Sequence, residues 1–174
     1  GTYFFADTLI NRHPSTENLI DVARLADKTV RFFAKEPVMA AISYSNFGSD
    51  AEGSPASMHE VVRVMQEQFP GLAIDGEMQV SFAINKTLRD RKYPFSRLFG
   101  KDVNTLIFPN LSSANIAQKL LQEMEVGEMI GPIQMGLKKP IHFTDIESSV
   151  RDIVNITTVA VIDAIVLEQV QKKS

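Results

Sequence analysis

The chain has 174 residues, of which 44% are apolar and 22% are charged, with a formal net charge of -3 and no cysteine. The weak acidity argues against the basic stripe of a nucleic-acid binder, and the lack of cysteine excludes disulfides and thiolate zinc sites. No apolar run reaches the ~18 residues of a membrane span. We therefore expect a cytoplasmic globular protein that binds neither nucleic acid nor membrane. Because the chain opens directly on a strand-like run, we also expect an excised piece of a longer protein.

The first half of the chain alternates short apolar runs with amphipathic segments, which predicts alternating strands and helices. In chain order we expect a strand over residues 2–6, a helix to residue 35, a strand over 38–44, a helix to 69, a strand over 72–74 and a helix over 80–88. Ser15 or Thr16 should cap the first helix, and Ser54, followed by Pro55, the second. The charged stretch from Arg89 to Lys92 should be a solvated surface.

The second half of the sequence predicts three more strands and two more helices. We expect a strand over residues 105–108, a helix to residue 124 capped by Ser112 or Ser113, short strands over 128–130 and 141–143, and a long helix over 149–170. The long helix carries apolar residues over a wide part of its surface. This width predicts burial on more than one side, in a second lobe or in a subunit contact.

The repeated order of strand and helix predicts an α/β fold, with a mainly parallel sheet covered by helices on both faces. Ligands bind such sheets at the carboxyl ends of the strands. The segments expected at those ends are Asp7, Ser43-Tyr44-Ser45, Asp75-Gly76-Glu77, Pro109-Asn110 and Gly131-Pro132.

Few of these residues form a recognisable chemical motif. The three histidines, His13, His59 and His142, lack metal-ligand spacing, and we expect them to be surface or packing residues. Residues 45–50 could present backbone N–H groups to a phosphate, or could form an ordinary turn between strand and helix. Asp75 and Glu77 could be an acid/base pair, but composition favours turn and helix-cap roles.

Six blocks in order along the chain carry a family resemblance. They are Phe5 to Asn11 with Pro14-Ser15, Ile42 to Ser49, Asp75 to Gln79, Ile107 to Leu111 with Asn115, Gly131 to Gly136 with Lys139-Pro140, and Ser149 to Asn155. Together they resemble the second half of the phosphotransacetylases (phosphate acetyl/butyryltransferases), which move an acyl group between coenzyme A and phosphate. The resemblance implies the C-terminal half of an isocitrate/isopropylmalate dehydrogenase-like fold. Residues 1–147 would be its inserted α/β lobe, and residues 148–174 a helix that returns to the first lobe or forms a dimer contact.

The departures from the family pattern bear on catalysis. Where the family has a serine and an arginine after its Lys-Pro pair, this chain has Asp145 and Ile146. Isoleucine cannot donate hydrogen bonds to a phosphate or carbonyl oxygen, and Asp145 and Glu147 add negative charge where an anionic substrate should bind. Glu123 replaces a basic residue of the family. We therefore expect no catalytic residues and no useful acetyl transfer.

Two residues that match functional positions of the family are retained, Lys119 and Asp152. The ligand-binding residues that we expect, for an acyl-CoA or a phosphate, are Ser45, Gly48, Ser49, Asp75, Lys119, Gly131 and Asp152. We expect no metal site.

Two further segments, residues 3–8 and 159–164, look closest to the phosphotransacetylase-like C-terminal domain of large bacterial NADP-dependent malic enzymes. This resemblance implies a non-catalytic, regulatory and oligomerising domain, with acetyl-CoA as a candidate effector and no cofactor of its own. NADP and a divalent metal would bind the upstream malic-enzyme domain, which would be a partner together with further copies of the chain in a homodimer or larger homo-oligomer. Two alternatives stay open: a divergent phosphate acyltransferase, with Asp145 as base, and a binding module for another acyl or phosphate ligand.

Overall fold

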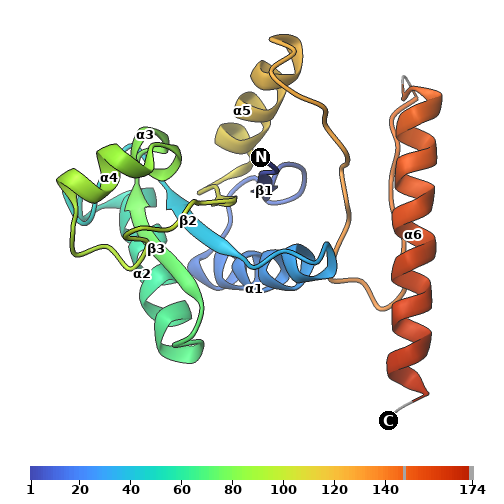
Figure 1. The fold of residues 1–174 in the computed structure, drawn as a ribbon, viewed down its shortest axis with the longest axis horizontal. Helices are drawn as coiled ribbons and strands as arrows, with labels where there is room; N and C mark the ends of the chain where they lie inside the picture. Colours follow the sequence, from blue (N-terminus) through green and yellow to red (C-terminus); the bar gives the residue numbers. More distant parts are fainter. Residues whose placement is uncertain (147, 173–174) are drawn as a thin grey trace. The chain divides into compact units, whose positions relative to one another are not determined.

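The computed structural model describes residues 1–146 and 148–172. These residues divide into two compact units, Gly1–Leu120 and a second unit that begins at Leu121, and each is described by itself. The elements are β1 (Phe4–Ala6), α1 (Thr16–Phe32), β2 (Val38–Ile42), α2 (Gly53–Gln68), β3 (Ala73–Met78), α3 (Val80–Ile84), α4 (Lys86–Lys92), β4 (Thr105–Ile107), α5 (Leu111–Glu123) and α6 (Val150–Gln171) (Figure 1).

The first unit holds a four-stranded sheet in the order β1-β4-β2-β3, and every neighbouring pair is parallel. β1, β2 and β4 are short runs of mainly apolar residues without strict alternation, which is typical of a parallel sheet covered on both faces. The predicted α/β class and the parallel sheet are therefore confirmed.

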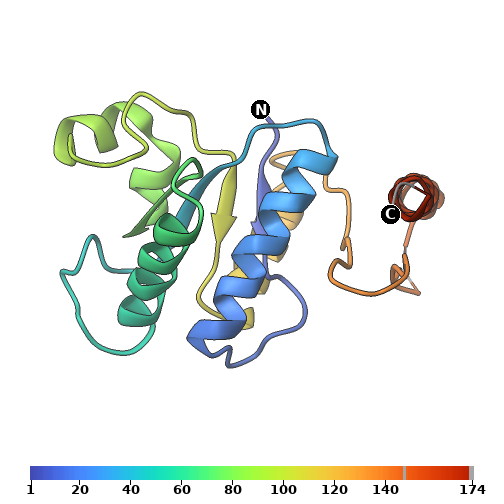
Figure 2. The ribbon, with the colours of Figure 1, turned by 90° about the horizontal axis from the view of Figure 1, so that it is seen from below.

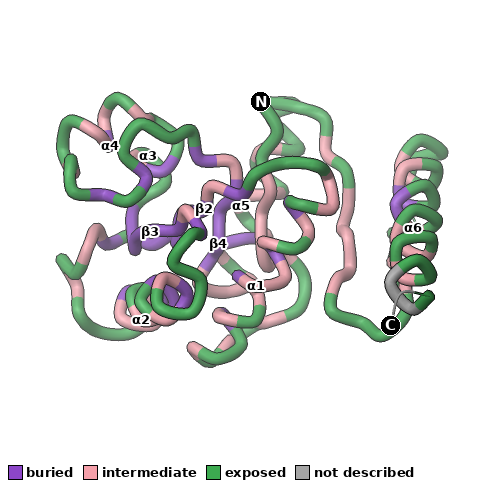
Figure 3. The backbone as a smooth tube through the Cα atoms, turned by 60° about the horizontal axis from the view of Figure 1, so that its bottom comes forward, coloured by how far each residue is buried: buried purple, intermediate pink, exposed green. Residues whose placement is uncertain are grey.

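Both faces of this sheet are covered. Along β2, Met39 and Ala41 pack into a cluster with α1 and α2, whereas Ala40 and Ile42 pack into a second cluster with residues of α3 and α5. Figure 2 shows α1 and α2 side by side on the first face, and Figure 3 shows the strands as the most buried part of the unit. Successive side chains of a strand point to opposite faces, so one short strand supplies both cores.

The helix caps agree only in part with the prediction. Ser15 caps α1 and shares a reciprocal capping box with Asn18, as predicted for the first helix. The predicted cap at Ser54 is wrong, because α2 already begins at Gly53 and its N-cap residue makes no side-chain hydrogen bond to the helix. The predicted serine caps of α5 are also wrong. Asn110 precedes this helix, and its side-chain oxygen accepts from the Ser113 N–H at 2.9 Å.

Three further expectations in the first unit need correction. β3 does not end before Asp75 but continues through Gly76 and Glu77 to Met78. The single predicted helix over residues 80–88 is two short helices, because Asn85 ends α3 and its side chain caps α4. Arg89 is fully buried and not part of a solvated surface. All three errors arise where polar side chains have partners inside the protein.

The second unit contains α6 and the segment before it. The predicted long helix is confirmed, although the short strands predicted over residues 128–130 and 141–143 do not form within the described residues. Ile156 and Val159 of α6 are buried, and the His142 ring lies 3.9 Å from Asp163 of the same helix. Across residues 1–146 and 148–172, none of the helices is long and apolar enough to cross a membrane.

Candidate functional site

The carboxyl edge of the sheet, where we expect ligands, is formed by the segments that follow each strand. Asp7 follows β1, and its carboxylate accepts from the N–H groups of Leu9, Ile10 and Asn11, which fixes that turn. The longest of these segments follows β2 and runs to α2 at Gly53. It contains three of the predicted ligand residues, and its geometry decides what this edge can bind.

The loop after β2 is held by one buried carboxylate. Glu77 of β3 has no exposed surface, and its Oε1 accepts from the Ser45 hydroxyl at 2.8 Å and from the Gly48 N–H at 2.7 Å. Its Oε2 lies 3.3 Å from Nδ1 of His59 on α2. Ser49 joins through its hydroxyl, which lies 2.9 Å from that of Ser45. The structure therefore brings Ser45, Gly48 and Ser49 together, around a residue that we did not predict.

The backbone N–H groups of residues 45–50 in this loop are all engaged within the protein. Three of them donate to serine hydroxyls: Ser45 to Ser43, Asn46 to Ser49, and Asp50 to Ser45. The N–H groups of Phe47 and Gly48 donate to the backbone carbonyl and to Oε1 of Glu77. The N–H of Ser49 donates to the carbonyl of Asn46. The loop therefore does not present a row of unused donors. An anion could bind to these N–H groups only by replacing one of their present acceptors.

Asp75 has a different set of partners. It is 8% exposed, and its Oδ2 accepts from the Ser96 hydroxyl at 2.7 Å and from the Arg97 N–H at 2.8 Å. It thus secures the segment between α4 and β4. The turn and helix-cap roles favoured for Asp75 and Glu77 are wrong, because both lie inside β3 and bind segments distant in sequence.

A hollow of about 260 Å³ lies beside the loop and is lined by Gly48, Asp50, Ala51, Ala56, His59 and Glu60. The hydrogen bond from the Tyr44 hydroxyl, 2.8 Å long, lowers the pKa of Asp50. The hydrogen bond from Arg63 likewise lowers the pKa of Glu60. Both carboxyl groups are therefore charged at neutral pH, so the hollow presents negative charge to solvent.

The remaining predicted residues lie on other segments of the chain. Lys119 is an exposed residue of α5 in the first unit, and Gly131, Asp145, Ile146 and Asp152 belong to the second unit. Glu147 lies outside the described residues. Among the residues that the structure describes, no group of three or more histidine or acidic side chains could hold a metal ion.

Asp152 has a clear structural role in the second unit. Its Oδ2 accepts from both the hydroxyl and the N–H of Ser149, at 2.6 and 3.0 Å, and its own N–H donates to the Ser149 hydroxyl. These bonds form a capping box at the start of α6 and lower the pKa of Asp152, with the side-chain bond as the largest cause. Ile146, which stands where the family has an arginine, is fully exposed.

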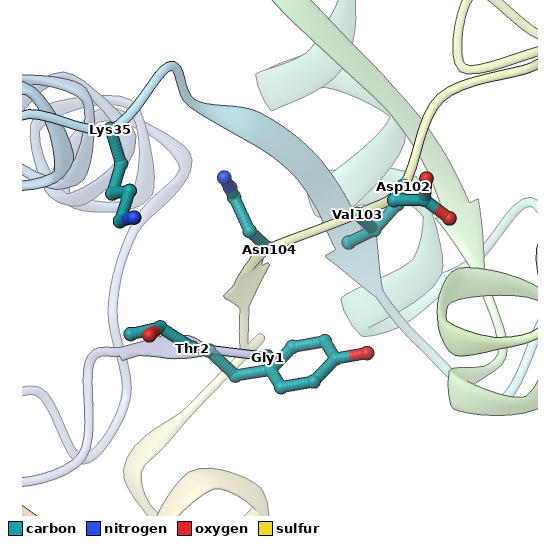
Figure 4. Close-up of a pocket in the computed structure, with 7 residues that line it drawn as sticks. Gly1, Thr2, Lys35, Asp102, Val103 and Asn104 are labelled. Atoms are coloured by element: carbon teal, nitrogen blue, oxygen red, sulfur yellow. The ribbon is translucent and has the colours of Figure 1, made fainter.

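Another hollow, of about 290 Å³, lies at the opposite edge of the sheet, before β1 and β4 (Figure 4). Lys35, Asp102 and Asn104 line it together with Gly1, Thr2, Tyr3 and Val103. None of the predicted ligand residues lines it. Since parallel sheets bind ligands at their carboxyl ends, we keep the loop after β2 as the candidate site.

Sequence reasoning missed Glu77 and His59 as partners of this loop. Glu77 lay inside a block that we singled out, but 32 residues separate it from Ser45 along the chain. A pattern of residues close in sequence cannot reveal such a contact.

Comparisons with known proteins agree with the resemblance in the sequence. A family model described as "Phosphate acetyl/butaryl transferase" matches residues 1–161. The chain is 40% identical over 165 residues to an NADP-dependent malic enzyme of Salmonella typhimurium, covering 94% of the chain and 22% of that enzyme. It is 35% identical over 167 residues to a phosphate acetyltransferase of Treponema pallidum, covering 94% of the chain and 49% of that protein.

A solved structure is also similar. The chain superposes on a phosphotransacetylase from Streptococcus pyogenes with a TM-score of 0.86 and 32% identity, covering 94% of the chain and 49% of the other. The chain thus spans about a fifth of the malic enzyme and about half of the two phosphotransacetylases that it matches.

Proposed function

Since the chain belongs to the phosphate acetyl/butaryl transferase family, we propose that it is the phosphotransacetylase-like C-terminal domain of an NADP-dependent malic enzyme. The parent enzyme would oxidatively decarboxylate malate to pyruvate, using NADP and a divalent metal in an upstream domain. The present domain would regulate and assemble that enzyme and would not transfer acyl groups. The identity and coverage of the malic-enzyme match support the assignment to this group.

One observation carries the non-catalytic proposal: the residues that replace the family's serine and arginine. Asp145 forms a tight turn with Ser148, and Ile146 extends fully into solvent without a polar group. Removing one transition-state contact costs about 3–4 kcal/mol in an enzyme, and two positions are changed together here. The retention of Asp152 is weak support for catalysis, because its capping bonds give it a structural role.

For the ligand, we propose an acyl-CoA or phosphate effector, with acetyl-CoA as the first candidate. Ser45, Gly48, Ser49 and Lys119 of the first unit would contact it, whereas a binding role for Gly131 and Asp152 stays an expectation from the sequence. Asp75 would act by holding the segment after α4. We also propose a homo-oligomer in which α6 supplies a subunit contact, as its exposed apolar residues suggest.

The regulatory proposal is tested on the full-length malic enzyme. Malate oxidation is measured against acetyl-CoA concentration, with and without the segment that corresponds to residues 1–174. We expect deletion to remove the acetyl-CoA response and to change the oligomer measured by light scattering. Coinciding inhibition curves together with an unchanged oligomer would contradict the proposal.

A divergent phosphate acyltransferase is the second candidate, and the 35% identity to a phosphate acetyltransferase favours it. Asp145 would then act as the base and Lys119 would hold phosphate. Formation of acetyl phosphate by the full-length protein, abolished by Asp152→Asn, would support this candidate. Since Asp152 also caps α6, the variant must first show unchanged helix content.

A further inference from the structure

We propose that the carboxylate of Glu77 is a built-in anion that fills the donor set of Ser45, Gly48 and His59, so that an external oxyanion binds there only when Glu77 is displaced. This inference rests on the proposed ligand site at the loop after β2. It adds that the Glu77 carboxylate occupies the place of an external anion at this site. The ligand class is a small oxyanion, such as a carboxylate or a phosphate group.

The first support is the burial of Glu77. An acidic side chain is almost never fully buried without partners, because its charge loses the stabilisation that water gives. Glu77 nevertheless has no exposed surface. Its charge must therefore be compensated by the groups around it.

The second support is the nature of those groups. A hydroxyl and a backbone N–H both donate to one oxygen, Oε1, at 2.8 and 2.7 Å. The imidazole of His59 lies 3.3 Å from the other oxygen, Oε2. Hydroxyls and backbone N–H groups are among the donors that proteins use for phosphate and carboxylate ligands. The three groups converge from the loop and from α2 on one carboxylate, as they would on a bound anion.

The third support is access from solvent. Gly48 and His59 both line the hollow of about 260 Å³ beside the loop. The His59 side chain is 58% exposed, whereas Glu77 is 0% exposed. Removal of the Glu77 side chain would therefore leave a cavity lined by donors, next to a hollow that small solutes can enter. The charged Asp50 and Glu60 at this hollow oppose the entry of anions, so a small singly charged oxyanion is the ligand best suited to this place.

The experiment removes the carboxylate and supplies a free one. Glu77→Ala is compared with the unchanged chain during titration with sodium formate, with sodium chloride keeping the ionic strength constant. We expect the Gly48 amide NMR signal of the variant to shift saturably with formate. At ten times its dissociation constant, formate should raise the melting midpoint by about 3–5 °C. Neither change should occur in the unchanged chain.

Ile74→Ala is the matched control, because Ile74 is a fully buried apolar residue of the same strand. It should be destabilised but not rescued by formate, since its cavity has no donors. If Glu77→Ala is unfolded in chloride, formate must restore its circular dichroism while leaving Ile74→Ala unfolded or unaffected. Absence of rescue, or equal stabilisation of all three proteins, would overturn the inference.

The two proposals fail separately. Formate rescue without any acetyl-CoA response of the parent enzyme would support the role of Glu77 and contradict the regulatory proposal. An acetyl-CoA response without formate rescue would overturn the built-in anion and leave the regulatory domain standing.

Discussion

Three buried polar residues, Asp75, Glu77 and Arg89, hold together segments that lie apart along the chain. Arg89 is fully buried and donates to the carbonyl oxygens of Ala83, Leu98 and Lys101. Its guanidinium also lies 3.2 Å from the Asp90 carboxylate. Arg89 therefore joins by hydrogen bonds two segments that also pack together through Ala83 and Leu98.

Replacement of Arg89 by alanine should cost about 3–5 kcal/mol of unfolding free energy. The variant leaves three carbonyl groups without their donor in a buried place and opens a cavity. Arg91→Ala on the same helix is the control, because Arg91 is exposed and should change stability by less than about 0.5 kcal/mol. Urea unfolding measures both, and equal losses would contradict the role assigned to Arg89.

Gly48→Ala should lower the unfolding free energy by about 1–2 kcal/mol, because the glycine has a φ of +82°, which a side chain disfavours. An added Cβ would meet no atom within 4 Å, so crowding does not contribute. Gly71→Ala is the control, since it has equal space without the left-handed backbone. Similar urea midpoints for the two variants would show that the loop relaxes at Gly48.

The partners of these buried polar residues could not be predicted from the sequence. Glycine, serine and acidic residues near Ser45 and Asp75 are typical of turns, and the sequence correctly placed Ser45 after β2 but wrongly placed Asp75, which lies inside β3, at a strand end. The donors of Glu77 come from 29 and 32 residues away, and those of Asp75 from 21 and 22 residues away. Local composition cannot distinguish a buried, bonded carboxylate from an exposed one.

At the scale of elements, apolar periodicity predicted the long helices and the alternation of strands and helices along the chain. It failed where polar residues continue a strand, as in β3, and where residues 128–143 looked like short strands. Gly131, Pro132, Gly136 and Pro140 interrupt that segment, and proline removes the N–H that a ladder requires. No strand forms over residues 128–143, and Ile130, Ile141 and Phe143 are each more than half exposed.

The start of α6 depends on the capping box between Ser149 and Asp152. Because its pKa is lowered in the folded state, ionised Asp152 stabilises the helix above its ordinary pKa of 3.8. This contribution should be lost as the pH falls through the lower, folded pKa. In Ser149→Ala, an NMR titration should place the pKa of Asp152 nearer 3.8. Ser148→Ala should leave it unchanged, and identical titrations of both variants would contradict this account.

At the scale of the whole molecule, the chain keeps the fold of its family, while Asp145 and Ile146 stand where the family has a serine and an arginine. The sequence identified the family because six blocks of turn and strand-end residues persist in order, and these residues define the fold. It could not show which of them still bind a ligand. Ser45 and Asp152 both match the family pattern, yet the structure uses each in internal hydrogen bonds.

An apolar stripe on α6 leads to the last prediction. Val150, Val154, Val161 and Ile165 are spaced by four, seven and four residues, so they share one side of the helix, and each is at least 50% exposed. Ile156 and Val159 are buried on another side. Such spacing is typical of a seam between two helices.

We therefore expect Val161→Glu to convert a dimer into monomers in light scattering, because a charge in a helix seam loses its hydration. Val166→Glu introduces the same charge at an exposed valine that follows Ile165 directly and so lies outside the stripe, and it should leave the proposed dimer intact. Dissociation by both variants would indicate a general charge effect. A dimer that survives Val161→Glu would show that the subunits meet elsewhere, since no isologous contact through this stripe could hold two buried glutamates together.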